Sequence, residues 1–334
     1  MENKKKTKRL SIGIFLTLAI LMAGVIVLHK NPFADPTEEL VKKILSCVVI
    51  AAVCVIFVKG YDKITVLPVE LWQNRHLIWK LSKNDFKKRY SGSYLGAIWA
   101  MAQPVVTVVM YFLVFELVFG SEGPLLSDGT RAPYVLSLTA GLVPWFFFSE
   151  ALNHGTMALL EYNYLVKKVV FKISILPIIK VIAASFIHVF FVGILIIMAC
   201  LYGYFPTIYT IQLLYYSACL FIFVLAICYT SCAVVIFFRD LSQIINIALQ
   251  IGIWATPILW NLGDMHSKFG DGVLLFKINP LVYIVEGYRS AIFEQKWFFE
   301  DFFSTMYFWI VTALLFALGA LVFKRLKVHF ADVL

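Results

Sequence analysis

Apolar runs, each about as long as the 20-residue helix that crosses roughly 30 Å of bilayer hydrocarbon, recur along this whole chain of 334 residues. Hydropathy predicts eight spans, at residues 10–29, 44–59, 95–119, 134–157, 174–202, 209–238, 243–262 and 302–323. The composition agrees, because 61% hydrophobic and 15% charged residues are too apolar a mixture for a soluble globular protein. We therefore expect an all-α polytopic membrane protein.

The first run follows five basic residues between positions 4 and 9, as the apolar part of a signal peptide would. It is long, lacks a small-residue cleavage pattern before Lys30 and is followed by a second span, so a retained anchor is predicted. Placing both termini in the cytoplasm puts 20 of the 29 lysines and arginines on the inner side. We predict a multi-pass protein of the plasma membrane with both termini cytoplasmic. The net charge of +9 then reflects topology and not nucleic-acid binding.

Residues 68–90 alternate apolar and basic side chains, unlike the segments around them. An amphipathic helix on the inner leaflet fits this pattern, with its apolar face in the acyl boundary and its cations toward anionic lipid. A solvated linker is the simpler alternative, but it would not need both Trp72 and Trp79.

The apolar stretch 272–293 is not counted as a span, because Lys277, Pro280, Glu286 and Arg289 interrupt it. We expect short re-entrant or interfacial helices broken at Pro280, with Glu286 and Arg289 paired three residues apart. An ordinary surface loop is the alternative.

Motifs for independent chemistry are missing from the sequence. It contains no phosphate-binding loop, no HExxH zinc motif and no paired aspartates for magnesium. All six cysteines fall inside apolar runs, and Cys228 and Cys232 are one helical turn apart, so buried thiols are a better interpretation than a metal site. The chain is therefore predicted not to be an enzyme, and to have no catalytic or metal-binding residues of its own.

Two polar stripes run along predicted spans. Phe146, Glu150 and His154 recur every four residues in the fourth span, and Gln250 and Trp254 extend a similar stripe in the seventh. Such stripes either seal helices together by hydrogen bonds or line a hydrated cavity, and the pattern does not separate these two roles. If they line a cavity, the residues predicted to form a translocation corridor are Phe146, Glu150, Gln250 and Trp254.

The short basic loop 158–173 has two interpretations, a positively charged turn or a stub helix that docks into a soluble partner. An ordered set of motifs favours the second. These motifs are Asp85–Trp99, Gln103–Pro104, Gly141–Ala151, Leu165–Lys168, Phe238–Leu241, Thr256–Leu259, Asn279–Leu281 and Phe323–Leu334. Over about residues 70–334, the chain resembles the membrane subunit of type-2 ABC exporters for polysaccharides.

The resemblance implies a domain organisation. Residues 1–60 add two transmembrane helices to the usual six, residues 61–92 hold an amphipathic gate helix, and residues 93–334 form the six-span core. The loop 158–173 becomes the coupling helix, and the segment 272–293 becomes the outer re-entrant helices. The coupling-helix residues expected to contact the ATPase are Tyr162, Leu165, Val166, Lys167 and Lys168.

The resemblance also implies partners and cargo. We expect a homodimer with its pore at the subunit interface, two copies of a separate ATP-binding subunit, and ATP and magnesium on that partner, with no cofactor on this chain. The cargo would be an undecaprenyl-linked polysaccharide such as O-antigen, a capsule-like glycan or teichoic acid. Lys87, Lys88 and Arg89 are candidates to bind the carrier pyrophosphate, with ordinary lipid phosphates as the alternative partners.

Three other functions remain open at this point. A type-2 exporter of a drug or small amphiphile shares the architecture and differs in cargo. A prenyl-linked glycosyltransferase would need clustered carboxylates or a basic catalytic constellation, and none is visible in the sequence. A secondary transporter would have inverted repeats, which are also not visible.

Overall fold

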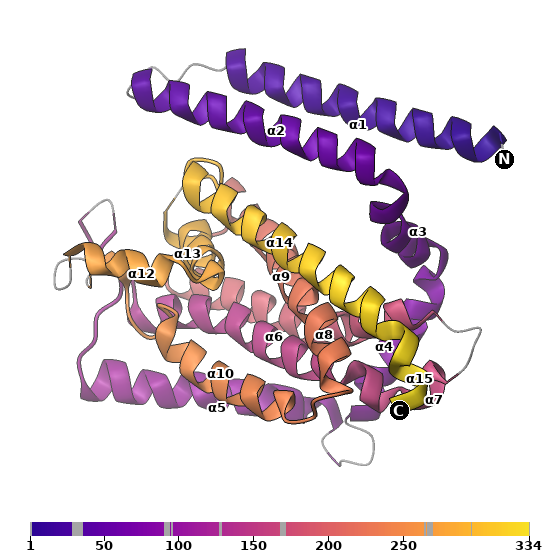
Figure 1. Ribbon diagram of the computed structural model, residues 1–334. Coiled ribbons are helices and arrows are strands. Elements are labelled where there is room, and N and C mark those ends of the chain that lie inside the picture. The colour runs from indigo at the N-terminus through magenta and orange to yellow at the C-terminus, as the bar shows by residue number, and fades with distance from the viewer. Residues whose placement is uncertain are drawn as a thin grey trace. The chain divides into compact units, whose positions relative to one another are not determined.

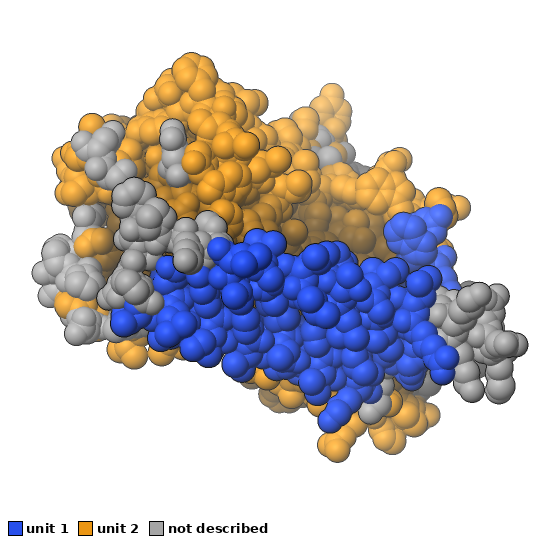
Figure 2. Space-filling model, turned by 90° about the horizontal axis from the view of Figure 1, so that it is seen from above, with its two compact units in different colours: residues 1–75 blue, residues 76–334 orange. Residues whose placement is uncertain are grey.

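The computed structural model describes residues 2–28, 36–89, 94, 96–126, 129–167, 172–263, 265, 270–294 and 296–333. Over these residues every regular element is a helix, apart from one isolated bridge between Leu125 and Arg131. The prediction of an all-α polytopic protein is therefore confirmed. The chain forms two compact units, residues 1–75 and 76–334, which Figure 2 colours separately.

The first unit contains α1 (Glu2–Leu28), α2 (Pro36–Ile64) and the short α3 (Val66–Gln73). The first two helices pack antiparallel, since Phe15 stacks on Phe57 with ring centroids 4.1 Å apart and Lys8 pairs with Asp62. Few of their side chains are buried within the unit. Helices that are apolar on most sides and exposed in this way are suited to contact with lipid.

The amphipathic segment 68–90 is not one helix. It divides at Asn74 into α3 and α4 (Arg75–Arg89), because the Asn74 backbone leaves helical geometry at φ −102° and ψ 11°. The Asn74 side-chain amide donates to the Glu70 carbonyl at 2.7 Å, and its backbone N–H donates to the same oxygen at 3.0 Å. Asparagine commonly ends helices through such local bonds. The boundary between the two compact units falls just after this break.

The second unit is organised around α6 (Tyr134–Glu161), which is apolar and buried on nearly every side. It packs against α8 (Leu176–Leu201) and α9 (Gln212–Val235), and α14 (Phe302–Leu326) packs on α9. The chain enters this unit through α5 (Trp99–Tyr111), which continues as a π-helical segment, η2 (Phe112–Val118). Glu116 of η2 accepts a hydrogen bond from the backbone N–H of Val135, so it satisfies one of the free donors at the start of α6.

Within the described residues, seven helices are long and apolar enough to cross a bilayer. The predicted eighth span, 243–262, differs because its helix, α10 (Leu241–Ala255), has only 15 residues. At 1.5 Å per residue it covers about 22 Å, less than the hydrocarbon thickness. The helix stops because Thr256 adopts extended backbone before Pro257, as residues that precede proline usually do.

The segment 272–293 forms two short helices, α12 (Leu274–Lys277) and α13 (Pro280–Phe293), so the expected break at Pro280 is confirmed. Asn279 caps α13 by accepting from the Leu281 N–H at 3.1 Å. The expected pair of Glu286 and Arg289 also forms, at 2.8 Å. In Figure 1, α12 and α13 lie at one end of the second unit, and α7 (Asn163–Val166) and α15 (Phe330–Val333) lie at the other.

Candidate functional site

A cavity of about 390 Å³ lies where α5, α6 and α8 meet. Helix α5 contributes Gln103 and Thr107 to its wall, and α8 contributes His188. Two residues of the predicted corridor, Phe146 and Glu150, line it from α6, together with His154 of the same stripe. The polar stripe of the fourth predicted span therefore lines a cavity, at least in part.

The other two predicted corridor residues lie elsewhere. Gln250 and Trp254 are exposed on α10 and do not line this cavity. The opposite side of α10 contacts α6, because a Cβ added to Gly252 would lie 2.7 Å from the Trp145 ring. The stripe of the seventh predicted span thus faces away from the interior of the unit.

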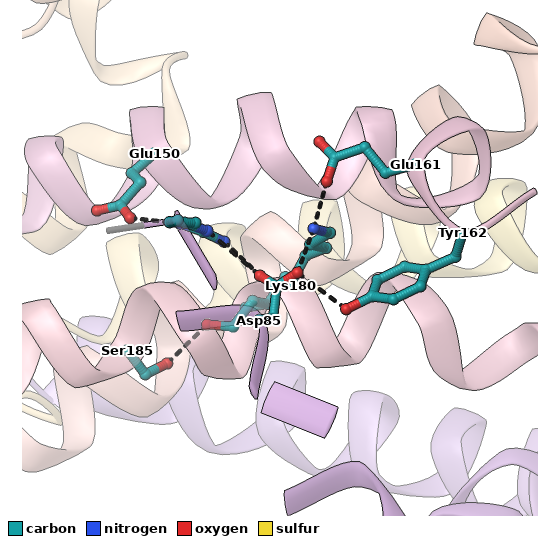
Figure 3. Close-up of polar contacts among 8 residues, drawn as sticks. Asp85, Glu150, Glu161, Tyr162, Lys180 and Ser185 are labelled. Carbon is teal, nitrogen blue, oxygen red and sulfur yellow. Dashed lines mark hydrogen bonds and ion pairs between the residues drawn. The ribbon is translucent and has the colours of Figure 1, made fainter. Parts of the chain in front are cut away.

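Beside the cavity, five ionisable side chains and one tyrosine form a charge cluster that joins four segments of the chain (Figure 3). Its members are Asp85, Arg89, Glu150, Glu161, Tyr162 and Lys180. Lys180 of α8 contacts Asp85 of α4 and Glu161 of α6, each at 2.5 Å. The Tyr162 hydroxyl donates to the same Asp85 carboxylate at 2.9 Å.

Arg89 links this cluster to the cavity. Its guanidinium contacts Asp85 at 3.0 Å and Glu150 at 2.7 Å. Because Glu150 also lines the cavity, a continuous set of ion pairs runs from Lys180 through Asp85 and Arg89 to the cavity wall. Charge-assisted bonds of this kind are among the stronger polar contacts in proteins.

The electrostatics of the cluster depend on burial and pairing. Lys180 and Asp85 are almost fully buried, so each needs the other to offset the loss of water. Burial by itself raises the pKa of Asp85, but the Lys180 hydrogen bond and charge, together with the Arg89 charge, lower that pKa below its usual value. Burial and the neighbouring Asp85 charge raise the pKa of Tyr162 far above its usual value, so its hydroxyl stays a donor.

The three basic residues predicted to bind a lipid headgroup have different environments. Arg89 is mostly buried and held by Asp85 and Glu150, so its charge is already used within the protein and its assignment to a lipid phosphate is corrected. Lys87 and Lys88 are exposed, and neither forms an ion pair with a described residue. A headgroup role for these two lysines stays a prediction.

The predicted coupling segment directly follows Tyr162. Val166 of α7 is buried, Leu165 is partly buried, and Lys167 is exposed. Tyr162 therefore belongs both to this segment and to the charge cluster. Lys168 lies outside the described residues.

A second polar group lies deeper in the unit. The His188 ring nitrogen Nε2 is 3.1 Å from the Ser217 hydroxyl and 3.0 Å from the Tyr288 hydroxyl, and the two hydroxyls are 2.6 Å apart. This triad joins α8, α9 and α13. Because His188 also lines the α5–α6–α8 cavity, the triad ties that cavity to α13.

The importance of Asp85 and Lys180 was not recognised from the sequence. Asp85 lies among basic residues in a segment with an amphipathic pattern, which suggests an exposed acid. Lys180 carried the stronger signal, since it is a lysine inside a predicted span and such charges are usually paired. Finding its partner required the tertiary structure, because 95 residues separate the two.

The described residues contain no group of three or more histidine, cysteine or acidic side chains placed to hold a metal ion. The three cysteines of α9, which are Cys219, Cys228 and Cys232, are buried free thiols. Cys228 lies directly against α6, since a Cβ added to Gly155 would approach its sulfur to 2.3 Å. This thiol therefore serves close helix packing.

Comparison with known proteins identifies a family and several relatives of this chain. Residues 76–293 match the sequence profile of the ABC-2 type transporter family. The chain is 27% identical to the O-antigen export system permease protein RfbA of Myxococcus xanthus over 227 residues, which is 68% of this chain and 84% of that protein. A Klebsiella pneumoniae protein of the same name is 25% identical over 255 residues, or 76% of this chain and 93% of the relative. The matched region begins at the first residue of the second unit.

Proposed function

The chain belongs to the ABC-2 type transporter family, and on this basis we propose that it is the transmembrane subunit of an ATP-driven exporter of a lipid-linked polysaccharide. Two of its relatives are named as O-antigen export permeases, which favours a polysaccharide over a small amphiphile as cargo. The observation that carries the mechanism is the charge cluster, since it connects the segment predicted to meet an ATPase with the cavity between α5, α6 and α8.

In this proposal the energy for export comes from a partner subunit that hydrolyses ATP. We found no sequence motif with which this chain could hold a nucleotide, so ATP and magnesium are assigned to a separate ATP-binding subunit, present in two copies beneath a homodimer. The chain itself needs no cofactor. Its contribution is to bind the partner, to carry the resulting movement across the bilayer and to shape the path for the glycan.

Force from the partner enters at Tyr164 and Leu165 of α7, which are exposed and partly buried, respectively. Displacement of α7 pulls on Tyr162, whose hydroxyl is bonded to Asp85. Asp85 shares its carboxylate with Arg89, and Arg89 holds Glu150 in the cavity wall. Movement at the surface segment therefore changes the position of a charged group that lines the cavity.

For the topology we propose that both termini are cytoplasmic and that the end carrying α7 and α15 faces the cytoplasm. An eighth crossing then consists of α10 and the residues after Ala255, which lead back toward the end of the unit where α12 and α13 lie (Figure 1). Lys87 and Lys88 are placed at the inner leaflet, where they attract phosphates of the carrier or of bulk lipid. The exposed side of α10, with Gln250 and Trp254, is assigned to the subunit interface where the pore forms.

Export in cells tests the proposal. A strain lacking this gene is complemented with wild-type protein, with Leu165→Asp or with Tyr164→Asp, and surface polysaccharide is measured by immunoblot. Val166 is avoided because it is buried and an aspartate there would disturb folding. Both variants are expected to insert normally, to lose copurification with the ATP-binding subunit and to export less than a tenth of the wild-type amount.

A control variant is Glu122→Gln, which removes one partner of an exposed ion pair with Arg131. It should export normally, because exposed pairs contribute little. The proposal fails if the deletion strain exports polysaccharide normally. It also fails if both aspartate variants keep the ATPase and full export.

A further inference from the structure

The second unit has another cavity, of about 820 Å³, at the end that carries α12 and α13. It is lined by one face of α13, by residues 296–301 and by the start of α14. This end lies opposite α7 and α15 (Figure 1), so the cavity is separate from the charge cluster. Its volume falls within the range of about 300–1,000 Å³ that is typical of small-molecule sites.

The charges in this cavity nearly balance, with a small acidic excess. Its carboxylates are Glu286, Glu294, Glu300 and Asp301. Its cations are Lys277, Arg289 and Lys296. Four acids against three bases give a net formal charge of −1, which does not favour phosphates or acidic glycans. A neutral, hydroxyl-rich ligand suits such a wall better, because carboxylates accept hydrogen bonds from hydroxyl groups.

One carboxylate is free to take part in such recognition. Arg289 binds Glu286 at 2.8 Å, Lys296 binds Glu294 at 3.1 Å, and Glu300 accepts from a backbone N–H at 2.8 Å. Asp301, by contrast, makes no hydrogen bond or ion pair with its side chain among the described residues, although it precedes α14 at the capping position. Its two oxygens are therefore available to a ligand.

Aromatic side chains form the rest of the wall. Trp297, Phe298, Tyr283 and Tyr307 line the cavity. Trp297 stacks parallel to Phe299 with ring centroids 5.9 Å apart, and Phe298 stacks on Tyr215 at 4.0 Å. Rings fixed in this way offer flat apolar surfaces beside hydrogen-bonding groups, as amphipathic ligands require.

The wall is held in place from inside the bundle. Gln212 of α9 is almost fully buried, and its amide donates to the Lys296 carbonyl at 2.8 Å. Its carbonyl oxygen accepts from the Phe298 N–H at 2.6 Å. One buried side chain therefore fixes the backbone on both sides of Trp297, which prearranges the aromatic wall.

We infer that this cavity binds neutral sugar units of the exported glycan at the outer end of the protein. The free acid and the fixed aromatic rings together match a sugar, which presents hydroxyls at its edge and C–H groups on its face. The inference rests on the proposed function for the choice of ligand, but the cavity has its own residues and its own test.

The test uses the full chain in lipid nanodiscs and, as probe, short neutral oligosaccharides made from the cell's surface polysaccharide by partial acid hydrolysis. Binding is titrated by saturation-transfer NMR for wild type, Asp301→Ala and Trp297→Ala. The matched controls are Asp240→Ala, an exposed acid before α10, and Trp72→Ala, an exposed tryptophan of the first unit. Inorganic phosphate serves as the anionic probe.

Wild type and both controls are expected to bind the oligosaccharides and not phosphate, and each cavity variant is expected to bind about tenfold more weakly, the factor that corresponds to 1.4 kcal/mol. Absence of binding to wild type overturns the inference, as does unchanged binding in both cavity variants or preference for phosphate. Oligosaccharide binding by a chain that does not export would reject the proposed function alone. Export without oligosaccharide binding would reject the cavity assignment alone.

Discussion

Lys180 of α8 and Asp85 of α4, 95 residues apart in the sequence, meet at 2.5 Å in a nearly water-free position. A buried ion pair need not stabilise the fold more than two apolar side chains in the same place would, because removing both charges from water is costly. It does mean that neither residue tolerates loss of the other. Variants that remove one charge and variants that remove both are therefore expected to differ in stability.

Removing one charge of this pair should be more damaging than removing both. We expect Lys180→Met to lower the free energy of unfolding by about 3–5 kcal/mol, because Asp85 and Glu161 lose their shared cation. The double variant Asp85→Asn with Lys180→Met should recover part of this loss. Thermal unfolding in detergent gives the comparison, with Lys43→Met as control, since Lys43 pairs with Glu39 on the more accessible surface of α2. Equal stability of wild type and the Lys180 variant would contradict the prediction.

Acid should weaken the contribution of Asp85. Its pKa is lowered in the folded protein, so its ionised form stabilises the fold above the unfolded pKa, and this contribution is lost as the pH falls through the lowered value. The difference in Tm between wild type and Asp85→Asn should therefore hold steady near neutral pH and shrink below about pH 4. A difference that grows on acidification would mean that the carboxylate is not held by cations.

Loss of the Tyr162 hydroxyl should uncouple ATP hydrolysis from export without unfolding the protein. In Tyr162→Phe the ring stays and only the bond to Asp85 is removed, which should cost about 1.5–3 kcal/mol in stability. We expect ATPase activity of the assembled complex to continue while export falls severalfold. Tyr202→Phe is the matched control, because that tyrosine is exposed and lies outside the coupling segment. Export at the wild-type level in Tyr162→Phe would remove this hydroxyl from the proposed route.

Gly155 should be intolerant of a methyl group. In Gly155→Ala the new Cβ would lie 2.3 Å from the Cys228 sulfur, so α6 and α9 must separate. Overpacking of this kind costs about 1–3 kcal/mol. Adding Cys228→Ala removes the obstructing sulfur and should restore most of the lost stability, as read from thermal unfolding. Gly193, which has open space around its Cβ position, supplies the control variant Gly193→Ala.

The positions of the long helices and one helix break could be predicted from the sequence, because both depend on neighbouring residues. Hydropathy predicts all seven helices that, among the described residues, are long enough to cross a bilayer. Pro280 marks the break before α13. The end of α10 is also encoded, because Thr256 precedes Pro257, but hydropathy continues past that point, so the helix is shorter than the predicted span. The division at Asn74 depends on a side chain bonding to its own helix, which residue pattern alone does not decide.

The charge cluster could not be derived in the same way. Basic residues 87–89 look equivalent along the sequence, yet Arg89 turns inward to Asp85 and Glu150 while its two neighbours are exposed. Only the packing of α4 against α6 and α8 distinguishes them. The stripe on α6 lies in the wall of a cavity, whereas the similar stripe on α10 faces outward, and the residue pattern does not distinguish the two.

The triad of His188, Ser217 and Tyr288 links the surroundings of the two cavities in the second unit. His188 lines the α5–α6–α8 cavity, and Tyr288 lies on α13 between Gly287 and Arg289, two residues that line the other cavity. His188 and Tyr288 are almost fully buried, so a shift of one side chain must be followed by the other or the bond between them is lost. A ligand that displaces α13 is therefore expected to move His188 as well, which would couple the cavity beside α13 to the one between α5, α6 and α8.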